Sequence, residues 1–390
     1  MVSPGEPRPL HVGDHTLSMQ IRGWILGVML FSTAFLGSVY ILTPLVPIML
    51  FYPRMWRTLV DRFVGFWVAM PACLLEYLFG TRVRVIGDKI EHSDPGLIIM
   101  NHRTRLDWLF FWAALYKMDP WLLTSEKISL KGILKYIPGA GWAMQCNSFI
   151  FLDRAFSKDE TKMNKMLDYY AQSGFNYQLL LFPEGTDKCP IATGRSKVHA
   201  KEKGLVHYDY VLHARTTGFV HMIQRMRRSG YIKYLYDVTI GFEGVIAQSE
   251  YALITHGLAP HDVHYQVIKI PIDSLPSDNE GLAAWLVKRW AEKEQKLKEF
   301  YSREDKETST FENTPNGCEY HLTPLLELIR VGVCLVWLTT SLMWIYFFFT
   351  VQCMFHLFFI SIAFFIGSQY VFGGVEWLAI DRFNALIDKE

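Results

Sequence analysis

Uncharged apolar stretches at both ends of the chain predict helices in contact with a membrane. Residues 23–53 contain no Asp, Glu, Lys or Arg over 31 positions, whereas about 20 apolar residues cross a bilayer. Pro44 and Pro47 are expected to end the helix early, so we predict a span at about 24–43 followed by an irregular segment. A secretory signal peptide is the competing interpretation, but this stretch is longer than a signal's apolar region and shows no clear cleavage site.

A second apolar stretch, 63–75, has only 13 residues and contains Pro71. It is too short to span a bilayer alone, so we expect an interfacial or half-inserted helix packed on the first one. Near the other end, residues 331–375 are 45 positions without Asp, Glu, Lys or Arg. Two helices at about 331–350 and 354–373 fit this length, and the resulting hairpin predicts an integral membrane protein.

The middle of the chain, residues 82–322, has the pattern of a soluble domain. Short apolar runs at 96–100, 149–152, 178–182 and 236–242 alternate with helical patterns. This alternation predicts an α/β domain with a mixed, mostly parallel sheet flanked by helices. Capping boxes are expected at Ser157 with Glu160 and at Ser277 with Glu280. The predicted organisation is a tail at 1–23, a membrane-embedded helical region at 24–80, the α/β domain at 82–303, a linker at 304–325, a transmembrane hairpin at 331–373 and a tail at 374–390.

Composition narrows the class of protein. Of the 390 residues, 51% are hydrophobic, which excludes a disordered chain. The 39 Lys and Arg against 38 Asp and Glu give a net charge of +1, which disfavours a nucleic-acid partner. Six cysteines form no CxxC pair and no Cys/His cluster with zinc spacing, so we expect no metal and a reducing compartment.

Polar residues follow three predicted strands, where ligands bind in α/β sheets. His102 and Asp107 follow the run 96–100; an orienting carboxylate would leave the other imidazole nitrogen as a general base, although the pair also fits a helix cap. Pro183-Glu184-Gly185-Thr186 follows the run 178–182 and fits either a phosphate-cradling turn or a plain turn. Arg154 follows the run 149–152 and fits either a phosphate clamp or a surface ion pair.

Taken together and in this order, the three blocks resemble the glycerolipid (1-acylglycerol-3-phosphate-type) acyltransferase family. Its blocks are H-x4-D, an arginine block, F-P-E-G-T and a later block matched here by Val211–Gly218. The stretches IIMNHRTRLDW, IPGAGWAMQ, LLLFPEGTD and YVLHARTTGF are similar to the lysocardiolipin branch of that family. The resemblance runs from about residue 20 to the C-terminal hairpin.

The resemblance implies acyl transfer from acyl-CoA to the free hydroxyl of a lysophospholipid, without a metal or organic cofactor. His102 would be the general base and Asp107 would orient it. The implied substrate-binding residues are Arg154, Glu184, Gly185, Thr186, Arg215 and Lys131. The implied partners are acyl-CoA, a lysophospholipid and the bilayer, in a multi-pass protein of the endoplasmic reticulum or of mitochondria-associated membranes. The alternatives are a catalytically silent lipid-binding membrane protein of the same fold and a hydrolase, for which no nucleophile is evident.

Asp187 departs from the pattern of the wider family, which often has Arg after Glu-Gly-Thr. An Asp repels a phosphate dianion but accepts hydrogen bonds from hydroxyls. We therefore expect Asp187 to favour lysocardiolipin, lysophosphatidylglycerol and lysophosphatidylinositol over lysophosphatidic acid. The competing interpretation is that Asp187 caps a following helix.

Overall fold

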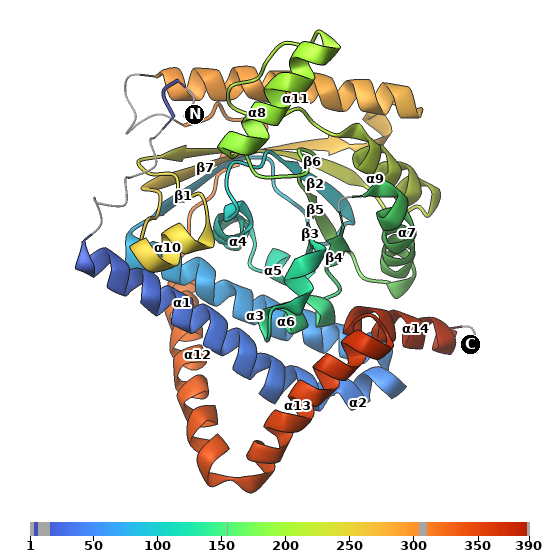
Figure 1. Ribbon diagram of the computed structural model, residues 1–390. Helices are drawn as coiled ribbons and strands as arrows, with labels where there is room; N and C mark the ends of the chain where they lie inside the picture. Colours follow the sequence, from blue (N-terminus) through green and yellow to red (C-terminus); the bar gives the residue numbers. More distant parts are fainter. Residues whose placement is uncertain (1–3, 7–15, 154, 304–309, 388–390) are drawn as a thin grey trace.

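The computed structural model describes residues 4–6, 16–153, 155–303 and 310–387. Figure 1 shows a twisted sheet with helices on both faces and, beneath this domain, a group of long helices. Within the described residues the sheet has eight strands in the order β4-β3-β5-β2-β6-β7-β1-β8. The strands are β1 Arg82–Gly87, β2 Gly96–Met100, β3 Glu126–Lys131, β4 Ile150–Leu152, β5 Gln178–Leu181, β6 Tyr234–Glu243, β7 Asp262–Pro271 and β8 Cys318–Glu319.

Most neighbouring strands are parallel. Five pairs are parallel (β1 with β7, β2 with β5 and β6, β3 with β4 and β5), whereas β6 with β7 and β1 with β8 are antiparallel. The predicted mixed, mostly parallel sheet is therefore confirmed. β8 lies within the predicted linker, so that segment contributes a short edge strand to the sheet. Residues 304–309 of the linker lie outside the described residues.

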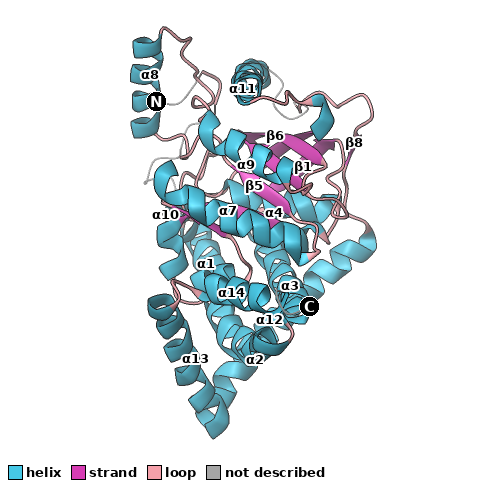
Figure 2. Ribbon diagram, turned by 90° about the vertical axis from the view of Figure 1, so that its right-hand side faces the viewer, coloured by secondary structure: helices cyan, strands magenta, loops and turns pink. Residues whose placement is uncertain are grey.

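Helices cover both faces of the sheet, with successive strand residues pointing to opposite sides. Leu97 and Ile99 of β2 share one core with α7 (Phe156–Ser173), α9 (Thr216–Arg228) and α11 (Asn279–Ser302). Ile98 and Met100 share the other core with α4 (Asp107–Met118) and α5 (Leu122–Ser125). Figure 2, coloured by secondary structure, shows α4, α7, α9 and α11 around the sheet. Three further helices are α6 Ala140–Cys146, α8 Pro190–Lys203 and α10 Glu250–His256.

Neither predicted capping box is formed. α7 begins at Phe156, so Ser157 lies inside the helix, and the Asp159 carboxylate instead accepts the backbone N–H of Asp153 and Ala155. α11 begins one residue later than a Ser277 cap requires, and Asp278 caps it by accepting the N–H of Gly281 at 2.7 Å. At α11 an Asp side chain, an equally good cap, therefore replaces the predicted Ser. At α7 the N-cap position is Ala155, which makes no side-chain cap, and Asp159 inside the helix binds the chain that leads into it.

The N-terminal helices lie under the domain as one layer (Figure 1). They are α1 Leu17–Gly37, a π-helical turn Ser38–Leu42, α2 Thr43–Phe51 and α3 Pro53–Phe79. The expected irregular segment after residue 43 is absent, since helix continues to Phe51. Pro44 is accommodated because the chain widens into the π turn just before it, where the N–H of Thr43 donates to the carbonyl of Ser38.

α3 is longer than the sequence predicted. It has 27 residues, so by length and composition it could cross a membrane, which the 13-residue apolar stretch alone did not suggest. The interfacial or half-inserted placement of this helix stays a prediction. Its charged residues do not end the helix because Arg57 and Asp61 pair one turn apart at 2.9 Å and are both buried. The most apolar window of α3 is 61% buried inside the protein, since α3 packs along α4 and α5.

A buried ion cluster joins α3 to the sheet. Lys127 of β3 donates to Asp61 at 2.7 Å and to Asn147 at 2.8 Å, and the hydroxyl of Tyr177 donates to the other Asp61 oxygen at 2.8 Å. Arg57, Asp61 and Lys127 are all nearly inaccessible. Breaking such a pair leaves a buried charge unpaired, at a cost of about 3–5 kcal/mol. The cluster therefore holds α3 firmly against the domain.

The C-terminal helices form the predicted hairpin. α12 (Pro324–Thr350) and α13 (Gln352–Val371) are joined at Val351 and project away from the domain (Figure 1). Their most apolar windows are only 22% and 17% buried, so their side chains face outward. The predicted tail at 374–390 contains a helix, α14 (Val375–Ile387), which returns to the domain, where Lys165 of α7 pairs with Asp381 at 2.6 Å.

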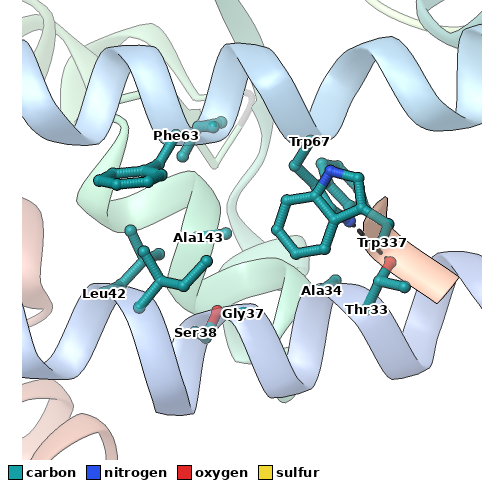
Figure 3. Close-up of a pocket in the computed structure, with 11 residues that line it drawn as sticks. Thr33, Ala34, Gly37, Ser38, Leu42, Phe63, Trp67, Ala143 and Trp337 are labelled. Carbon is teal, nitrogen blue, oxygen red and sulfur yellow. Dashed lines mark hydrogen bonds between the residues drawn. The ribbon is translucent and has the colours of Figure 1, made fainter. Parts of the chain in front are cut away.

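A small apolar cavity of about 20 Å³ lies between α1, the π turn, α3 and α12 (Figure 3). Trp67 and Phe63 cover it from α3, and Trp337 closes it from α12. The Trp67 indole N–H donates to the Thr33 hydroxyl at 2.8 Å, so the one polar group of that indole is satisfied. A space of this size holds at most one water molecule. We therefore regard it as a packing gap between helices.

Candidate active site

His102 and Asp107 lie at the carboxyl end of β2, where the chain turns into α4. Nδ1 of His102 is 2.9 Å from Oδ2 of Asp107. Asp107 is completely buried, and its carboxylate also accepts the N–H and the hydroxyl of Thr104. The Asn101 amide bonds both the N–H and the carbonyl of Ile240 on β6, which anchors the start of this turn. The Asp107 carboxylate is thus held rigidly against one imidazole nitrogen.

The other nitrogen of His102, Nε2, is left for a substrate. An acceptor carboxylate at Nδ1 favours the tautomer with a proton on that nitrogen and a lone pair on Nε2. The ring stacks on Phe182, with centroids 4.1 Å apart, and its side chain is 13% exposed. This arrangement gives His102 the orientation and access that a general base needs.

The buried carboxylate of Glu184 links three parts of the domain by hydrogen bonds. Its carboxylate accepts the N–H of His102 at 3.2 Å, the N–H of Leu212 at 3.1 Å and the indole N–H of Trp290 at 3.2 Å. Burial raises the pKa of Glu184 to about 7, while the three donors and His102 oppose that shift. These three bonds fix Glu184 between the His102 loop, the Leu212 loop and α11, which is a positioning role. That Glu184 also binds substrate stays a prediction.

The turn after Glu184 faces Arg215. Gly185 has φ of +73°, a backbone conformation that favours glycine, and a Cβ there would lie 3.3 Å from the Arg215 side chain. The N–H of Arg215 donates to the carbonyl of Pro183 at 2.8 Å, which joins the two blocks. Thr186 follows, half-buried. Arg154, also predicted to bind substrate, lies outside the described residues.

A cavity of about 310 Å³ opens beside His102. It brings together four predicted site residues, namely His102, Lys131, Gly185 and Arg215. Lys131 and Arg215 are exposed cations that come from the ends of β3 and of the loop before α9. The remaining wall is mainly apolar and includes Leu130, Leu152, Phe156, Met163, Leu181, Phe182 and Phe219. A base, two cations and an apolar wall therefore share one cavity.

Asp187 does not cap a helix. α8 begins at Pro190 after Cys189, and Asp187 instead accepts the Gln248 amide at 3.2 Å and lies 3.9 Å from Nε of Arg105. It is not among the described residues that line the cavity.

Sequence reasoning missed the contributions of Phe156 and Phe219 to the cavity, because an apolar helix residue carries no signal of the ligand it faces. Among the described residues, no group of three or more His, Cys, Asp or Glu could hold a metal ion.

Comparison with known proteins places the chain in a family. Residues 82–243 match the acyltransferase family model, and residues 254–330 match the model of the acyltransferase C-terminus. Lysocardiolipin acyltransferase 1 of Mus musculus is 37% identical over 366 residues, which cover 94% of this chain and 96% of that protein. Lysophosphatidylinositol acyltransferase 10 of Caenorhabditis elegans is 45% identical over 285 residues, 73% of each chain.

The chain belongs to the acyltransferase family, and it is an enzyme of that class. It is similar to lysocardiolipin acyltransferase 1 over nearly its whole length, including the helices at both ends. A third relative, the 2-acyl-1-lysophosphatidylinositol acyltransferase of Saccharomyces cerevisiae, is 26% identical over 63% of this chain and 70% of that protein.

Proposed function

We propose that the protein is an acyl-CoA-dependent lysophospholipid O-acyltransferase. The observation that carries the proposal is the His102–Asp107 pair, with Nδ1 and Oδ2 2.9 Å apart, at the edge of the cavity that also holds Lys131 and Arg215. An acyl transferase to a hydroxyl needs a base for a weakly acidic alcohol, and this pair supplies one. No metal or organic cofactor is required in the proposal, because acyl-CoA brings an activated thioester as co-substrate.

In the proposed reaction the acceptor hydroxyl attacks the thioester carbonyl while Nε2 of His102 takes its proton. The Asp107 carboxylate stabilises the resulting imidazolium. A tetrahedral intermediate forms, and its oxyanion needs nearby donors, for which the backbone N–H groups around Gly185 and the Lys131 ammonium are the candidates. Collapse breaks the carbon–sulfur bond, and the imidazolium returns the proton to the CoA thiolate. The products are a phospholipid with one more acyl chain than the acceptor and free CoA.

Lys131 and Arg215 are proposed to hold phosphate, with Arg154 added from the family resemblance. Both cavity cations are exposed and sit against an apolar wall. A lysophospholipid and acyl-CoA each carry phosphate and an acyl chain, so this combination suits either substrate. Guanidinium groups bind phosphate with two parallel hydrogen bonds, which also orient it.

We propose a phosphodiester acceptor, with lysophosphatidylinositol, lysocardiolipin and lysophosphatidylglycerol preferred to lysophosphatidic acid. The names of the relatives support this, since two of them act on lysophosphatidylinositol and one on lysocardiolipin. Asp187 lies outside the cavity lining but only two positions after Gly185, so we propose that its negative charge disfavours a phosphate dianion near that turn. The membrane helices support residence in a bilayer, and we propose the endoplasmic reticulum with the domain on the cytosolic side, where acyl-CoA is available.

The decisive experiment is an assay of the purified full-length protein in nanodiscs with labelled oleoyl-CoA and a panel of four lyso-acceptors. The proposal expects a labelled acylated product with lysophosphatidylinositol or lysocardiolipin, and none with the His102→Ala variant. Product formed equally by wild type and His102→Ala would overturn the mechanism. Absence of product with every acceptor would overturn the acyltransfer proposal itself.

The same panel tests the role of Asp187. Asp187→Arg is expected to raise the rate with lysophosphatidic acid relative to lysophosphatidylinositol, since it replaces an anion by a cation beside the turn. Asp187→Asn, which removes the charge but keeps the shape, is the matched control and is expected to shift the ratio less. An unchanged acceptor ranking in Asp187→Arg would remove Asp187 from acceptor selection.

A further inference from the structure

The N-terminal segment, residues 4–6, is bound to the domain directly behind the loop that carries His102. Figure 1 places it beside α11, at the end of the domain away from α12 and α13. Glu6 is 6% exposed, and its carboxylate accepts Nε of Arg103 at 2.9 Å and Nη2 at 3.2 Å. Nζ of Lys188 lies 3.5 Å from the same carboxylate. One carboxylate therefore serves two buried cations.

The backbone of this segment also makes specific contacts with the domain, besides those of the Glu6 side chain. The Tyr210 hydroxyl donates to the carbonyl of Pro4 at 2.7 Å. Gly5 has φ of +75°, and a Cβ at this position would lie 2.2 Å from the carbonyl oxygen of Tyr301. Only glycine fits there. Three consecutive residues thus make contacts that an incidental surface segment does not need.

Arg103 connects this segment to the active-site loop. It directly follows His102, is 7% exposed, and its Nη1 donates to the carbonyl of Lys188 at 3.1 Å and to the Gln248 side chain at 3.0 Å. The Gln248 amide in turn donates to Asp187 at 3.2 Å. The guanidinium therefore joins both motifs of the site, the H-x4-D loop and the E-G-T-D turn. Its Nε and Nη2 atoms are bonded to Glu6.

The charge of Glu6 matters because its neighbours are cationic. Burial lowers the pKa of Lys188, and the carboxylate of Glu6 opposes that shift. A buried cation that loses its counter-charge draws in water or moves toward solvent. For Arg103 such a movement would pull on the backbone of the neighbouring His102.

We propose that Glu6 is a positioning residue for the reaction, acting through Arg103 to hold the His102 loop and the Asp187 turn in register. This inference rests on the proposed acyltransferase function. Among the described residues, the cavity wall includes no member of the N-terminal segment. The segment therefore acts on the placement of the base and not on substrate binding, and its loss should lower kcat while KM for both substrates is kept.

The test compares six forms of the full-length protein in nanodiscs, namely wild type, Glu6→Gln, Gly5→Ala, Arg103→Met, Glu6→Gln with Arg103→Met, and the control Glu299→Gln. Glu6→Gln keeps the shape of the side chain and removes its charge, whereas Gly5→Ala displaces the segment and keeps the charge. Glu299→Gln is the matched control, since Glu299 is an exposed carboxylate on α11 that accepts a hydrogen bond from the neighbouring Gln295 amide. Rates are measured well below the thermal unfolding midpoint of each form.

We expect Glu6→Gln and Gly5→Ala to lower kcat at least tenfold with KM changed less than threefold, and Glu299→Gln to match wild type. The double variant should be no slower than the slower single variant, because both act on one element. A kcat of Glu6→Gln within twofold of wild type overturns the proposal, as does a lowered unfolding midpoint with kcat intact. Multiplicative losses in the double variant overturn the route through Arg103. Inactivity of wild type overturns the proposed function instead.

Discussion

The carbonyl oxygen of His102 accepts a hydrogen bond from the backbone N–H of Lys188 at 2.8 Å. The N–H of His102 in turn donates to the Glu184 carboxylate. Both main-chain groups of His102 are thus bonded to residues of the segment 184–188. The two motifs that lie 82 positions apart in sequence are therefore one structural unit. The two motifs meet because they follow β2 and β5, which pair in parallel.

The first prediction concerns the base. His102→Ala should lower kcat by about 10² to 10⁴, the usual effect of removing a general base. The thermal unfolding midpoint should fall only modestly, since the partly exposed ring stacks on Phe182 and the Asp107 carboxylate, which loses its bond to the ring, keeps the N–H and hydroxyl of Thr104. The exposed His199→Ala on α8 serves as the control and should retain full activity. Activity of His102→Ala within a few-fold of wild type would assign the base elsewhere.

The second prediction is a pH dependence of stability caused by Glu184. Its folded-state pKa of about 7 lies above the ordinary value of 4.5, so between these values the folded protein binds more protons than the unfolded chain. Stability from this group is present below about pH 4.5 and is lost as pH rises through 7, by up to about 3 kcal/mol. Glu184→Gln lacks this loss.

Chemical denaturation of wild type and Glu184→Gln from pH 4.5 to 8 measures the difference directly. The free energy of unfolding of the variant, relative to wild type, should increase with pH across this window. Glu299→Gln removes an exposed carboxylate and should show no such slope. Parallel curves for wild type and Glu184→Gln would contradict the elevated pKa.

The third prediction uses two glycines of α1. At Gly23 a Cβ would lie 2.3 Å from the carbonyl oxygen of Ile254 on α10, so Gly23→Ala should force α1 and the domain apart and destabilise the protein by roughly 1–3 kcal/mol. At Gly37 a Cβ would meet the Trp337 ring at 3.4 Å, beside the small cavity of Figure 3. Gly37→Ala should stabilise by about 0.5–1 kcal/mol. The thermal unfolding midpoints of both variants, measured in the same detergent, test the two predicted directions. Equal shifts of the midpoint for Gly23→Ala and Gly37→Ala would refute the packing of α1 on α10.

The fourth prediction concerns the orientation of the hairpin. Both the N-terminal segment and α14 contact the domain, so both ends should lie on its side of the membrane, with the turn at Val351 on the other. In microsomes, a glycosylation acceptor inserted in a spacer at Val351 should be glycosylated, and one before residue 4 should not. Leu342→Arg, at a position 59% exposed, should impair insertion by about 2.5–3.5 kcal/mol, whereas Ser341→Ala, at a buried position, should not. Glycosylation at both ends would contradict this topology.

The sequence predicted the fold well where the apolar pattern was clear. The strands at 96–100 and 178–182 are found almost as expected, and so is the hairpin, because a long uncharged stretch has few other structures. β3 was missed, since Glu126 and Lys127 make it look polar although both are buried in pairs. β7 was also missed, because Asp262 and His264 interrupt its apolar run although both side chains are buried.

The candidate site was predicted in part. His102, Lys131, Gly185 and Arg215 do meet at one cavity, because each follows or precedes an element that ends at the same edge of the sheet. Glu184 and Asp187 bind protein groups, and a sequence cannot distinguish a carboxylate that faces substrate from one that faces Trp290 or Gln248. Glu6 carried no signal at all, since its partners Arg103 and Lys188 lie 97 and 182 positions away.

The ion cluster of Arg57, Asp61 and Lys127 has a consequence for how the enzyme meets its lipid. Because it joins α3 to the strand that ends at Lys131, the distance of the cavity from the bilayer surface is set by a rigid connection and not by a flexible tether. The enzyme can then be sensitive to the depth at which a hydroxyl group sits. We therefore expect a higher rate of acylation with lysophospholipids in loosely packed or strongly curved membranes, where a lipid moves out of the bilayer more easily, than in flat, tightly packed ones.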